Sequence, residues 1–254
     1  MAGLRGLRGK TVLVTGAAGA IGRAIAARLA EEGCAVGVLD VAADGAAAVA
    51  AELRAAGGRA LALAADITDP EAVEDAVQKL VGETGSVEGL VNNAGWDRAE
   101  PFLETDRDFW RRVVDVNLYG PLHVTHAVLR RMHARGAGRV VSIASDAGRV
   151  GSSGEAVYAA CKGGIIAFSK SVAREVAKTG ITLNCVCPGP TDTPLLANVD
   201  PTGKLQQALQ RAIPMRRLGR PDDLPGIVAF LLSDDAAYIT GQTLSVSGGL
   251  TMHG

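Results

Sequence analysis

A tyrosine and a lysine stand four positions apart at Tyr158 and Lys162, and this spacing places both side chains on one face of a helix. A free phenol ionises near pH ~10 and a neighbouring cation favours its ionised form, so we expect Lys162 to lower the pKa of Tyr158. The pair is a candidate proton donor and acceptor. Ser145 ends the strand-like run 139–145, where its hydroxyl is expected to hydrogen-bond the oxygen atom that Tyr158 protonates.

A glycine-rich segment follows the first predicted strand, and Gly16, Gly19 and Gly22 lead into the next predicted helix. Gly16 permits a tight turn, small residues let the backbone approach a pyrophosphate, and a helix N-terminus offers free N–H groups to phosphates. Asp40 ends the second predicted strand, where a carboxylate accepts hydrogen bonds from an adenosine ribose and repels a 2′-phosphate. The pattern predicts a dinucleotide site that prefers NAD to NADP. The alternative is that Asp40 only caps the following helix.

Polar side chains also end the next two predicted strands. Asp66 is placed to hold an adenine edge, and residues 92–95 close the fourth strand, although both segments are equally typical of turns. Asn117 interrupts an apolar helical stretch, which predicts a hydrogen-bond partner for its amide. Trp96 is expected either to wall a substrate pocket or to anchor its loop.

The composition is typical of a globular protein, and its charge balance gives no sign of a strongly charged partner. The 254 residues are 48% hydrophobic and 21% charged, with 26 basic and 27 acidic side chains. This balance argues against nucleic acid or an anionic membrane surface as a partner. No uninterrupted apolar stretch is long enough for a signal peptide or a membrane span, so a soluble, unexported protein is expected.

The cysteine and histidine residues predict neither disulfides nor a metal site. The cysteines form no disulfide framework, so we interpret them as reduced packing residues in a reducing compartment, most simply the cytoplasm; they are Cys34, Cys161, Cys185 and Cys187. His123 and His126 share a helical face, but no further ligand set accompanies them. They are predicted to be packing or interface residues.

Short β-branched runs alternate with longer amphipathic segments along residues 1–254, which predicts a single domain of α/β class. The expected architecture is a Rossmann-type, doubly wound parallel sheet of about seven strands with helices on both faces. The predicted strands are 11–14, 35–39, 60–64, 89–91, 139–144, 181–187 and 242–246. The predicted helices are 22–32, 43–56, 70–84, 106–135, 155–179, 203–212 and 222–232.

One excursion, residues 188–214, departs from this alternation. It contains Pro188, Pro190, Pro194 and Pro201, and a long loop in a compact domain is more often functional than incidental. The segment is predicted to be a substrate lid. An irregular connection without a function is the alternative.

Taken together, these motifs resemble the short-chain dehydrogenase/reductase family over essentially the whole chain. The matching motifs, in the family's order, are 15–22, Asp66, 92–95, Asn117, Ser145, Tyr158 with Lys162, Pro188 with Gly189, 239–242 and 248–249. Ala20 departs from the pattern, since the family's cofactor loop usually has a glycine there. Its methyl group is expected to be tolerated.

The resemblance implies an oxidoreductase in which Tyr158 is the acid/base and Lys162 lowers the Tyr158 pKa and binds the nicotinamide ribose. It also implies that Ser145 orients the substrate oxygen and that Asn117 holds a water of the proton relay. The residues implied to contact NAD are Gly16, Gly19, Ala20, Ile21, Gly22, Asp40, Asp66, Ile67, Asn93, Ala94, Gly95, Tyr158, Lys162, Pro188, Gly189, Thr191 and Thr193.

Segments 93–97, 145–158 and 187–193 are similar to the branch of this family that oxidises 2-hydroxycyclohexane-1-carboxyl-CoA, a 3-hydroxyacyl-CoA, with NAD. An acyl-CoA is therefore the expected substrate, with Trp96, Arg149 and Glu155 as candidate contacts. Arg149 either binds a CoA phosphate or pairs with Glu155 or another acid.

Other readings of the same residues remain. One is a 3-oxoacyl-acyl-carrier-protein reductase, which usually prefers NADPH and presents a basic patch to its acidic carrier. Another is a dehydrogenase for a sugar or a simple secondary alcohol. A non-catalytic dinucleotide sensor is disfavoured because Ser145, Tyr158 and Lys162 are all present. Family membership also implies a homotetramer, with the helices predicted at 106–135 and 155–179 pairing between subunits.

Overall fold

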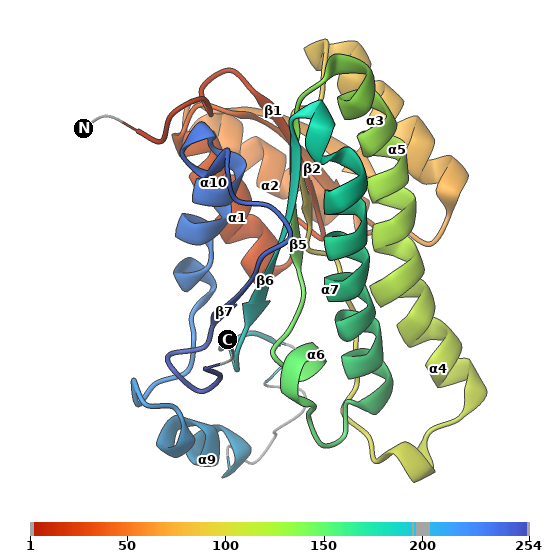
Figure 1. Ribbon diagram of the computed structural model, residues 1–254, viewed down its shortest axis with the longest axis vertical. Coiled ribbons are helices and arrows are strands. Elements are labelled where there is room, and N and C mark those ends of the chain that lie inside the picture. The colour runs from red at the N-terminus through yellow and green to blue at the C-terminus, as the bar shows by residue number, and fades with distance from the viewer. Residues whose placement is uncertain (1–2, 195, 197–203, 253–254) are drawn as a thin grey trace.

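Seven parallel strands form one sheet in the order β3-β2-β1-β4-β5-β6-β7, in a computed structural model that describes residues 3–194, 196 and 204–252 (Figure 1). The strands are β1 Thr11–Thr15, β2 Ala35–Asp40, β3 Arg59–Ala64, β4 Gly89–Asn92, β5 Gly138–Ile143, β6 Ile181–Pro188 and β7 Thr243–Val246. All seven predicted strands are confirmed to within about one residue at each end. Every residue of β1 is buried, as expected for a central strand covered on both faces.

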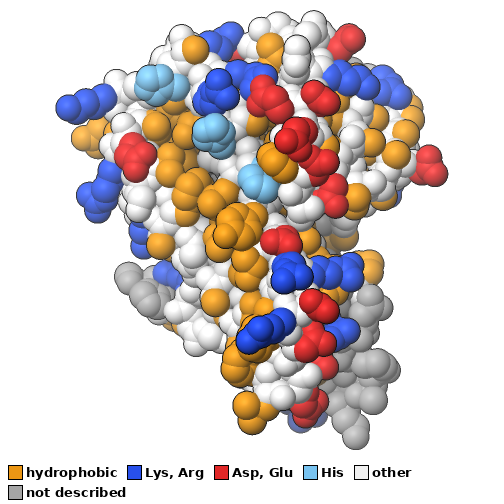
Figure 2. Space-filling model, turned by 90° about the vertical axis from the view of Figure 1, so that its right-hand side faces the viewer, with side chains coloured by type: hydrophobic (Ala, Val, Ile, Leu, Met, Phe, Trp, Pro, Cys, Tyr) orange, Lys and Arg blue, Asp and Glu red, His pale blue; other side chains and the backbone are white. Residues whose placement is uncertain are grey.

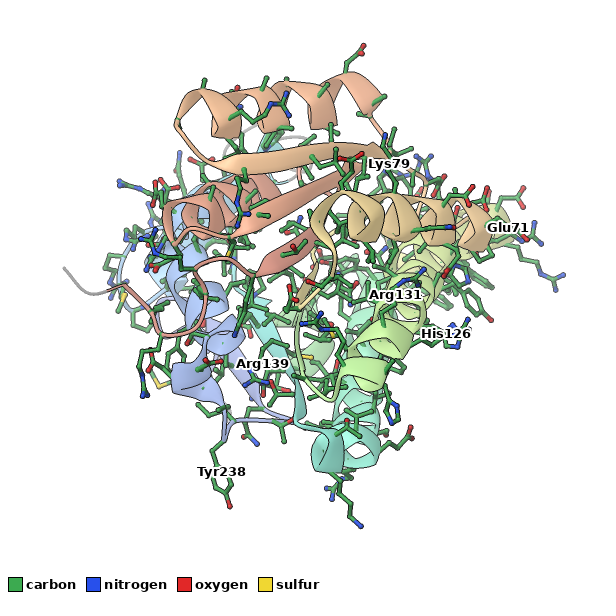
Figure 3. All side chains as sticks on the ribbon, turned by 90° about the horizontal axis from the view of Figure 1, so that it is seen from above. Glu71, Lys79, His126, Arg131, Arg139 and Tyr238 are labelled. Atoms are coloured by element: carbon green, nitrogen blue, oxygen red, sulfur yellow. The ribbon has the colours of Figure 1, made fainter. Side chains whose placement is uncertain are left out.

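Helices cover both faces of the sheet (Figures 1 and 3). The described α-helices are α1 Ala20–Glu31, α2 Ala43–Ala55, α3 Pro70–Thr84, α4 Arg107–Val114, α5 Gly120–Arg135, α6 Ala147–Val150, α7 Ala156–Val176, α9 Lys204–Ala212 and α10 Pro225–Leu232, of which α6 and α9 lie beyond the carboxyl ends of the strands. One buried core includes Ile25 of α1 and Val228 of α10, and the other includes Val77 of α3 and Val124 of α5. The arrangement confirms the predicted doubly wound, Rossmann-type fold.

The structure divides two helices that the sequence predicted to be continuous. A π-helical turn, Asp115–Tyr119, separates α4 from α5, and the 3₁₀ turn Pro221–Asp223 precedes α10, which has its own proline at Pro225. A single-residue change of helical register does not alter the apolar pattern enough to be read from sequence. The four-residue helix α6 was also missed, because it is too short to show a period.

The predicted lid, residues 188–214, is described only in part. Thr191 forms a β-bridge with Gly219, and α9 lies toward the end of the segment. Residue 195 and residues 197–203 lie outside the described part of the chain. The lid therefore stays a prediction.

The four cysteines are free and buried, which confirms the interpretation of them as packing residues. Burial raises the pKa of the Cys34 thiol to about 11 and that of the Cys187 thiol to about 12. His123 packs with its Nδ1 atom 3.1 Å from the Ile67 carbonyl oxygen. Among the helices described, none has both the length and the apolarity needed to cross a bilayer.

Helices α3 and α5 lie against each other mainly through apolar contacts. Arg131 of α5 also reaches Glu74 of α3, with Nη2 2.6 Å from Oε1, and Figure 3 labels this arginine where the two helices meet. Because Glu74 remains partly exposed, such a pair contributes at most about 1 kcal/mol. Apolar burial therefore holds this layer on the sheet.

Helix α1 starts so close to the loop before it that one of its residues has no room for a side chain. A Cβ atom on Gly22 would lie 2.2 Å from the Gly16 carbonyl oxygen and 2.7 Å from the Asn93 amide nitrogen. Gly16 itself has a φ of 61°, in the left-handed region that favours glycine. The glycines of this loop thus set how tightly α1 approaches β1 and β4.

We predict opposite effects for alanine at two helical glycines. Gly22→Ala should destabilise the protein by about 1–3 kcal/mol, because the methyl group forces the loop backbone to move. Gly82→Ala, in α3, should stabilise it by about 0.5–1 kcal/mol, since its Cβ meets nothing within 4 Å and alanine favours the helix. Denaturant unfolding of both variants measures the two changes. A Gly22→Ala protein as stable as wild type would contradict the close packing.

Candidate active site

The loops that leave β1 and β4 are tied together at the carboxyl edge of the sheet. Asn93 Nδ2 donates to the carbonyl oxygens of Thr15 and Gly16, each at 3.0 Å. In return, Thr15 Oγ1 accepts the backbone N–H groups of Asn93, at 3.0 Å, and Ala94, at 3.1 Å. The strand order reverses between β1 and β4, which is where open α/β sheets form their ligand crevice.

Asp40, at the end of β2, holds the glycine-rich loop from the other side. Its carboxylate accepts the N–H of Ala18 at 2.9 Å and the N–H of Ala42, just before α2, at 3.0 Å. These contacts agree with the alternative of a structural role next to α2, and the preference for NAD stays a prediction. The side chain supports the start of α2, and it also lines the cavity described next.

A cavity of about 930 Å³ opens over these loops. The predicted cofactor residues that line it are Gly16, Gly19, Ala20, Ile21, Gly22, Asp40, Asp66, Ile67, Asn93, Ala94, Gly95 and Thr193. Trp96 also lines it, as do Arg111 and Arg112 of α4, which the sequence analysis missed. Arginines are common on exposed helix faces, so nothing in the sequence distinguished these two.

The cavity fits a dinucleotide in its wall chemistry. Its floor is the glycine-rich loop at the N-terminus of α1, where small residues keep the backbone accessible and the first turn of the helix can offer N–H groups to phosphate oxygens. Ala20 begins α1 and lines the cavity without blocking the loop. Asp66 accepts hydrogen bonds from the backbone N–H and the hydroxyl of Thr68, at 2.9 and 2.8 Å, so it forms a turn while facing the same space.

The predicted proton-transfer group comes together at the start of α7. The side chains of Ser145 and Tyr158 lie close enough to interact, and Lys162 Nζ lies 5.4 Å from the centre of the Tyr158 ring. Lys162 is buried, and its ammonium donates to the Ile143 carbonyl oxygen at 3.1 Å. The helical spacing therefore puts the phenol and the ammonium side by side, as the sequence predicted.

The expected effect of Lys162 on the pKa of Tyr158 stays a prediction, because other groups dominate the pKa of this phenol. The pKa of the half-buried Tyr158 lies above its usual value, first because burial disfavours the phenolate and then because Glu155 and Asp97 are negative nearby. The neighbouring Ser145 hydroxyl acts against this rise of the Tyr158 pKa. Burial also lowers the pKa of Lys162 to about 8, so the lysine is itself a weakened cation in this site.

Asn117 lies in the π-helical turn and is completely buried. Its Nδ2 donates to the carbonyl oxygens of Trp96, at 2.6 Å, and Val113, at 3.0 Å, and its Oδ1 accepts the Trp96 N–H at 3.2 Å. The partner that the sequence required is thus the Trp96 backbone. The implied role of Asn117 in a water relay stays a prediction.

Trp96 is anchored in its loop, as one sequence alternative proposed, and it also lines the cavity. Its backbone is anchored by Asn117, and its ring lines the cavity with the Arg112 guanidinium 4.0 Å from the ring centre. Phe109 packs edge-on at 5.9 Å between centroids. This side of the cavity is therefore a flat aromatic wall.

The segment after β6 contributes less to the cavity than predicted. Among the described residues of this segment that were predicted to contact the cofactor, Thr193 lines the cavity, whereas Pro188, Gly189 and Thr191 do not. Gly189 N–H pairs with the Val246 carbonyl at 3.0 Å, and Thr191 Oγ1 donates to the Gly189 carbonyl at 2.9 Å. These hydrogen bonds fix the path of the chain as it leaves the sheet.

Arg149 and Glu155 take separate positions. Arg149 Nη1 donates to Ser245 Oγ of the edge strand β7 at 2.7 Å, and Ser245 in turn hydrogen-bonds Asp146. Glu155 instead lines a small hollow beside Tyr158. The structure thus gives Arg149 a contact with β7 that neither sequence alternative proposed.

The hollow beside Tyr158 contains a carboxylate that the sequence analysis missed, that of Asp97. Asp97 is 8% exposed, and burial, with Glu155 adding to it, raises its pKa to about 6. The available signal was its place directly after Trp96, in the loop that closes β4. Phe102 and Phe109 form the apolar part of the same hollow.

Comparison with known proteins places this geometry in a large group of related chains. A family profile described as enoyl-(acyl carrier protein) reductase matches residues 16–251. The crystal structure of a chain described as a short-chain alcohol dehydrogenase, from Sinorhizobium meliloti 1021, superposes with a TM-score of 0.92 at 34% identity, covering 98% of this chain and 97% of that one.

Sequence relatives agree with the structural match. The 3-oxoacyl-[acyl-carrier-protein] reductase FabG of Escherichia coli (strain K12) is 42% identical over 96% of this chain and 98% of its own length. Nodulation protein G of Azospirillum brasilense is 38% identical, covering 95% of this chain and 98% of the relative. The chain therefore belongs to the short-chain dehydrogenase/reductase family of oxidoreductases, as its motifs predicted.

Proposed function

We propose that this protein interconverts 3-hydroxyacyl and 3-oxoacyl thioesters with NAD(H). The grouping of Ser145 and Tyr158 beside buried Lys162 carries the proposal, since it lets two hydroxyl groups reach a single substrate oxygen atom. The names of the relatives, several of them 3-oxoacyl-[acyl-carrier-protein] reductases, support a 3-oxoacyl group as the carbonyl substrate. The carboxylate of Asp40 in the cavity supports NAD(H) rather than NADP(H).

The protein's part in the reaction is to position one oxygen and move one proton. When bound, the nicotinamide cofactor supplies or accepts the hydride. In reduction, the Tyr158 hydroxyl gives its proton to the oxygen of the former carbonyl, while Ser145 Oγ–H donates a hydrogen bond to the same oxygen. In oxidation, Tyr158 Oη takes the proton of the substrate hydroxyl. Trp96 and Arg112 close the side of the cavity away from the loop.

The carrier of the acyl group has two candidates. The names of the relatives favour an acyl-carrier-protein thioester and the reducing direction. The sequence prediction of an acyl-CoA and the oxidising direction is favoured by Asp40, because catabolic oxidation generally uses NAD. Both substrates share the thioester and the oxygen atom on the β-carbon. Ser145 and Tyr158 are proposed to act on that oxygen atom.

A homotetramer is part of the same proposal. Figure 2 shows hydrophobic side chains gathered in a band down the face that carries α4, α5 and their neighbours. Tyr119, between these two helices, keeps 51% of its surface exposed in the single chain. An apolar band of this kind supports subunit pairing along the helices that the sequence analysis named.

We predict that Tyr158→Phe abolishes turnover and preserves NAD binding. Removing the hydroxyl removes the proton donor, which is worth about 10²–10⁴-fold in rate, while the cavity walls are unchanged. Steady-state kinetics and calorimetric titration with NAD measure the two effects. Tyr238→Phe is the matched control, because Tyr238 is fully exposed and points away from the molecule (Figure 3). A Tyr158→Phe protein with substantial residual activity would refute the assignment.

We predict that Asp40→Asn shifts cofactor preference toward NADP. Loss of the negative charge removes repulsion of a 2′-phosphate, and the amide oxygen can still accept one backbone N–H. The ratio of kcat/KM for NAD to that for NADP should fall roughly tenfold or more, which corresponds to a loss of about 1.4 kcal/mol in discrimination between the cofactors. Asp44→Asn, an exposed change in the first turn of α2, should leave the ratio as in wild type. An unchanged ratio in Asp40→Asn would leave this carboxylate a purely structural role.

A substrate panel tests the proposed function directly. Cyclic and linear 3-oxoacyl groups on pantetheine, CoA and acyl carrier protein, and the matching 3-hydroxyacyl thioesters, are assayed with both cofactors. We expect turnover of the thioesters with NAD(H) to exceed turnover of sugars and simple secondary alcohols, and to vanish in Tyr158→Phe. Activity confined to sugars or simple alcohols would overturn the thioester assignment while leaving the reaction type intact.

A further inference from the structure

Helix α6 is a single turn, Ala147–Val150, and Ser145 lies two residues before its start. The Ser145 Oγ atom accepts the backbone N–H of Ala147 at 3.1 Å, and the Ser145 carbonyl oxygen accepts that of Gly148 at 3.0 Å. The bond to Oγ uses an acceptor position of the hydroxyl, so its hydrogen is left to donate to a ligand. A helix of four residues is unstable by itself, so contacts with other elements must hold α6, and with it Ser145, in place.

On one side, α6 touches α7 without a side chain between them. A Cβ atom on Gly148 would lie 2.6 Å from the backbone nitrogen of Gly163 and 2.7 Å from the carbonyl carbon of Lys162. A Cβ atom on Gly163 would likewise lie 3.1 Å from the Gly148 carbonyl oxygen. Through α6, Ser145 is therefore held against the turn of α7 that carries Lys162.

On the other side, α6 is tied to the edge strand β7 by a chain of side chains. Arg149 Nη1 donates to Ser245 Oγ at 2.7 Å, and Ser245 Oγ–H donates to Asp146 Oδ1. The main chain adds one contact, because the Asp146 N–H donates to the Pro188 carbonyl oxygen at 3.2 Å. Guanidinium, hydroxyl and carboxylate therefore form a line of charge-assisted hydrogen bonds between α6 and the sheet.

Ser245 is the residue on which this connection depends. Asp146 is 6% exposed, and its Oδ2 atom has no hydrogen-bond partner among the described residues. The Ser245 hydroxyl is thus the only side-chain donor that the described residues offer to this carboxylate. Without it the buried carboxylate would have no side-chain partner, and such a group costs stability unless the chain moves to hydrate it. Loss of this hydroxyl should therefore displace α6.

We propose that Ser245 is a positioning residue for Ser145, acting through Asp146 and α6. It holds α6 against α7, so that the Ser145 hydroxyl points at the oxygen atom of the substrate carbonyl. The inference rests on the proposed function, in which Ser145 donates a hydrogen bond to this oxygen. Asp146 and Ser245 are 99 positions apart in the chain, so the proposal gives the last strand of the sheet a part in the chemistry.

The test is a double-mutant cycle on Ser245 and Ser145. Ser245→Ala alone should lower kcat roughly five- to tenfold, because a displaced Ser145 hydroxyl no longer fits the transition state. The KM for NAD should stay as in wild type, since Ser245 does not line the cofactor cavity. In a Ser145→Ala background the same substitution should change kcat by less than about twofold, because the residue that Ser245 positions is absent. Equal effects in the two backgrounds would overturn the proposal.

Two further substitutions on β7 are the controls. Ser245→Thr keeps the hydroxyl and should keep most of the wild-type kcat. Thr243→Val is the matched control, because Thr243 lies two residues away on the same face of β7 and its buried Oγ1 has no partner among the described residues. Its kcat should equal that of wild type. A loss of kcat in Thr243→Val as large as in Ser245→Ala would show a general effect of β7 and contradict the specific role of Ser245.

Hydrogen exchange gives a readout that needs no turnover. The N–H groups of Arg149 and Val150 donate to the Asp146 carbonyl oxygen at 2.9 and 3.0 Å, so their exchange reports on α6. Exchange should be roughly tenfold faster in Ser245→Ala than in wild type, the effect of losing one hydrogen bond to a charged group. Thr243→Val should exchange as wild type does.

The outcomes separate this proposal from the proposed function. If no thioester is turned over but α6 exchanges faster in Ser245→Ala, the proposed function fails, the hold of Ser245 on α6 stands, and the cycle is run on the carbonyl substrate that the panel identifies. If thioesters are turned over, the cycle is additive and exchange is unchanged, the role of Ser245 fails alone. Circular dichroism checks that Ser245→Ala is folded. If it is not, Asp146→Asn, which keeps the shape of the side chain and removes its charge, replaces it in the cycle with the same expected outcome.

Discussion

The hydrogen bonds that Asn93 makes to the loop after β1 are the constraint on which the site depends. They join two strands that meet where the sheet reverses its order, so the glycine loop and the loop carrying Trp96 are fixed relative to each other. Asn117 then holds Trp96 from the far side. A cavity wall built from two irregular loops is thereby as well defined as the strands themselves.

Burial, more than any single charge, sets the chemistry around the phenol. Lys162 is buried, so desolvation weakens it as a cation, and the burial of Tyr158 likewise raises the pKa of the phenol. The nearby acids Asp97 and Glu155 act in the same direction as desolvation on the tyrosine. The pKa of the phenol therefore depends on its burial and on these acids as well as on the lysine beside it.

The sequence predicted the strands, most helices and the grouping of Ser145 with Tyr158 and Lys162, because these follow from period, length and spacing. The three residues lie together because Ser145 follows the end of β5 and the other two share one face of α7. What sequence could not supply was contact between segments distant in the chain. The entry of α4 into the cavity wall and the enclosure of Asp97 depend on how loops fold back on the sheet, and the π-helical turn depends on a local register that leaves no periodic trace.

The enclosed cysteines have a practical consequence. Thiols react as thiolates, and all four here are both shielded from solvent and shifted toward the protonated form. The native chain should therefore be nearly inert to maleimides and iodoacetamides while it stays folded. A cysteine engineered onto an outward-facing position could carry a fluorophore or spin label without first removing those that nature placed inside.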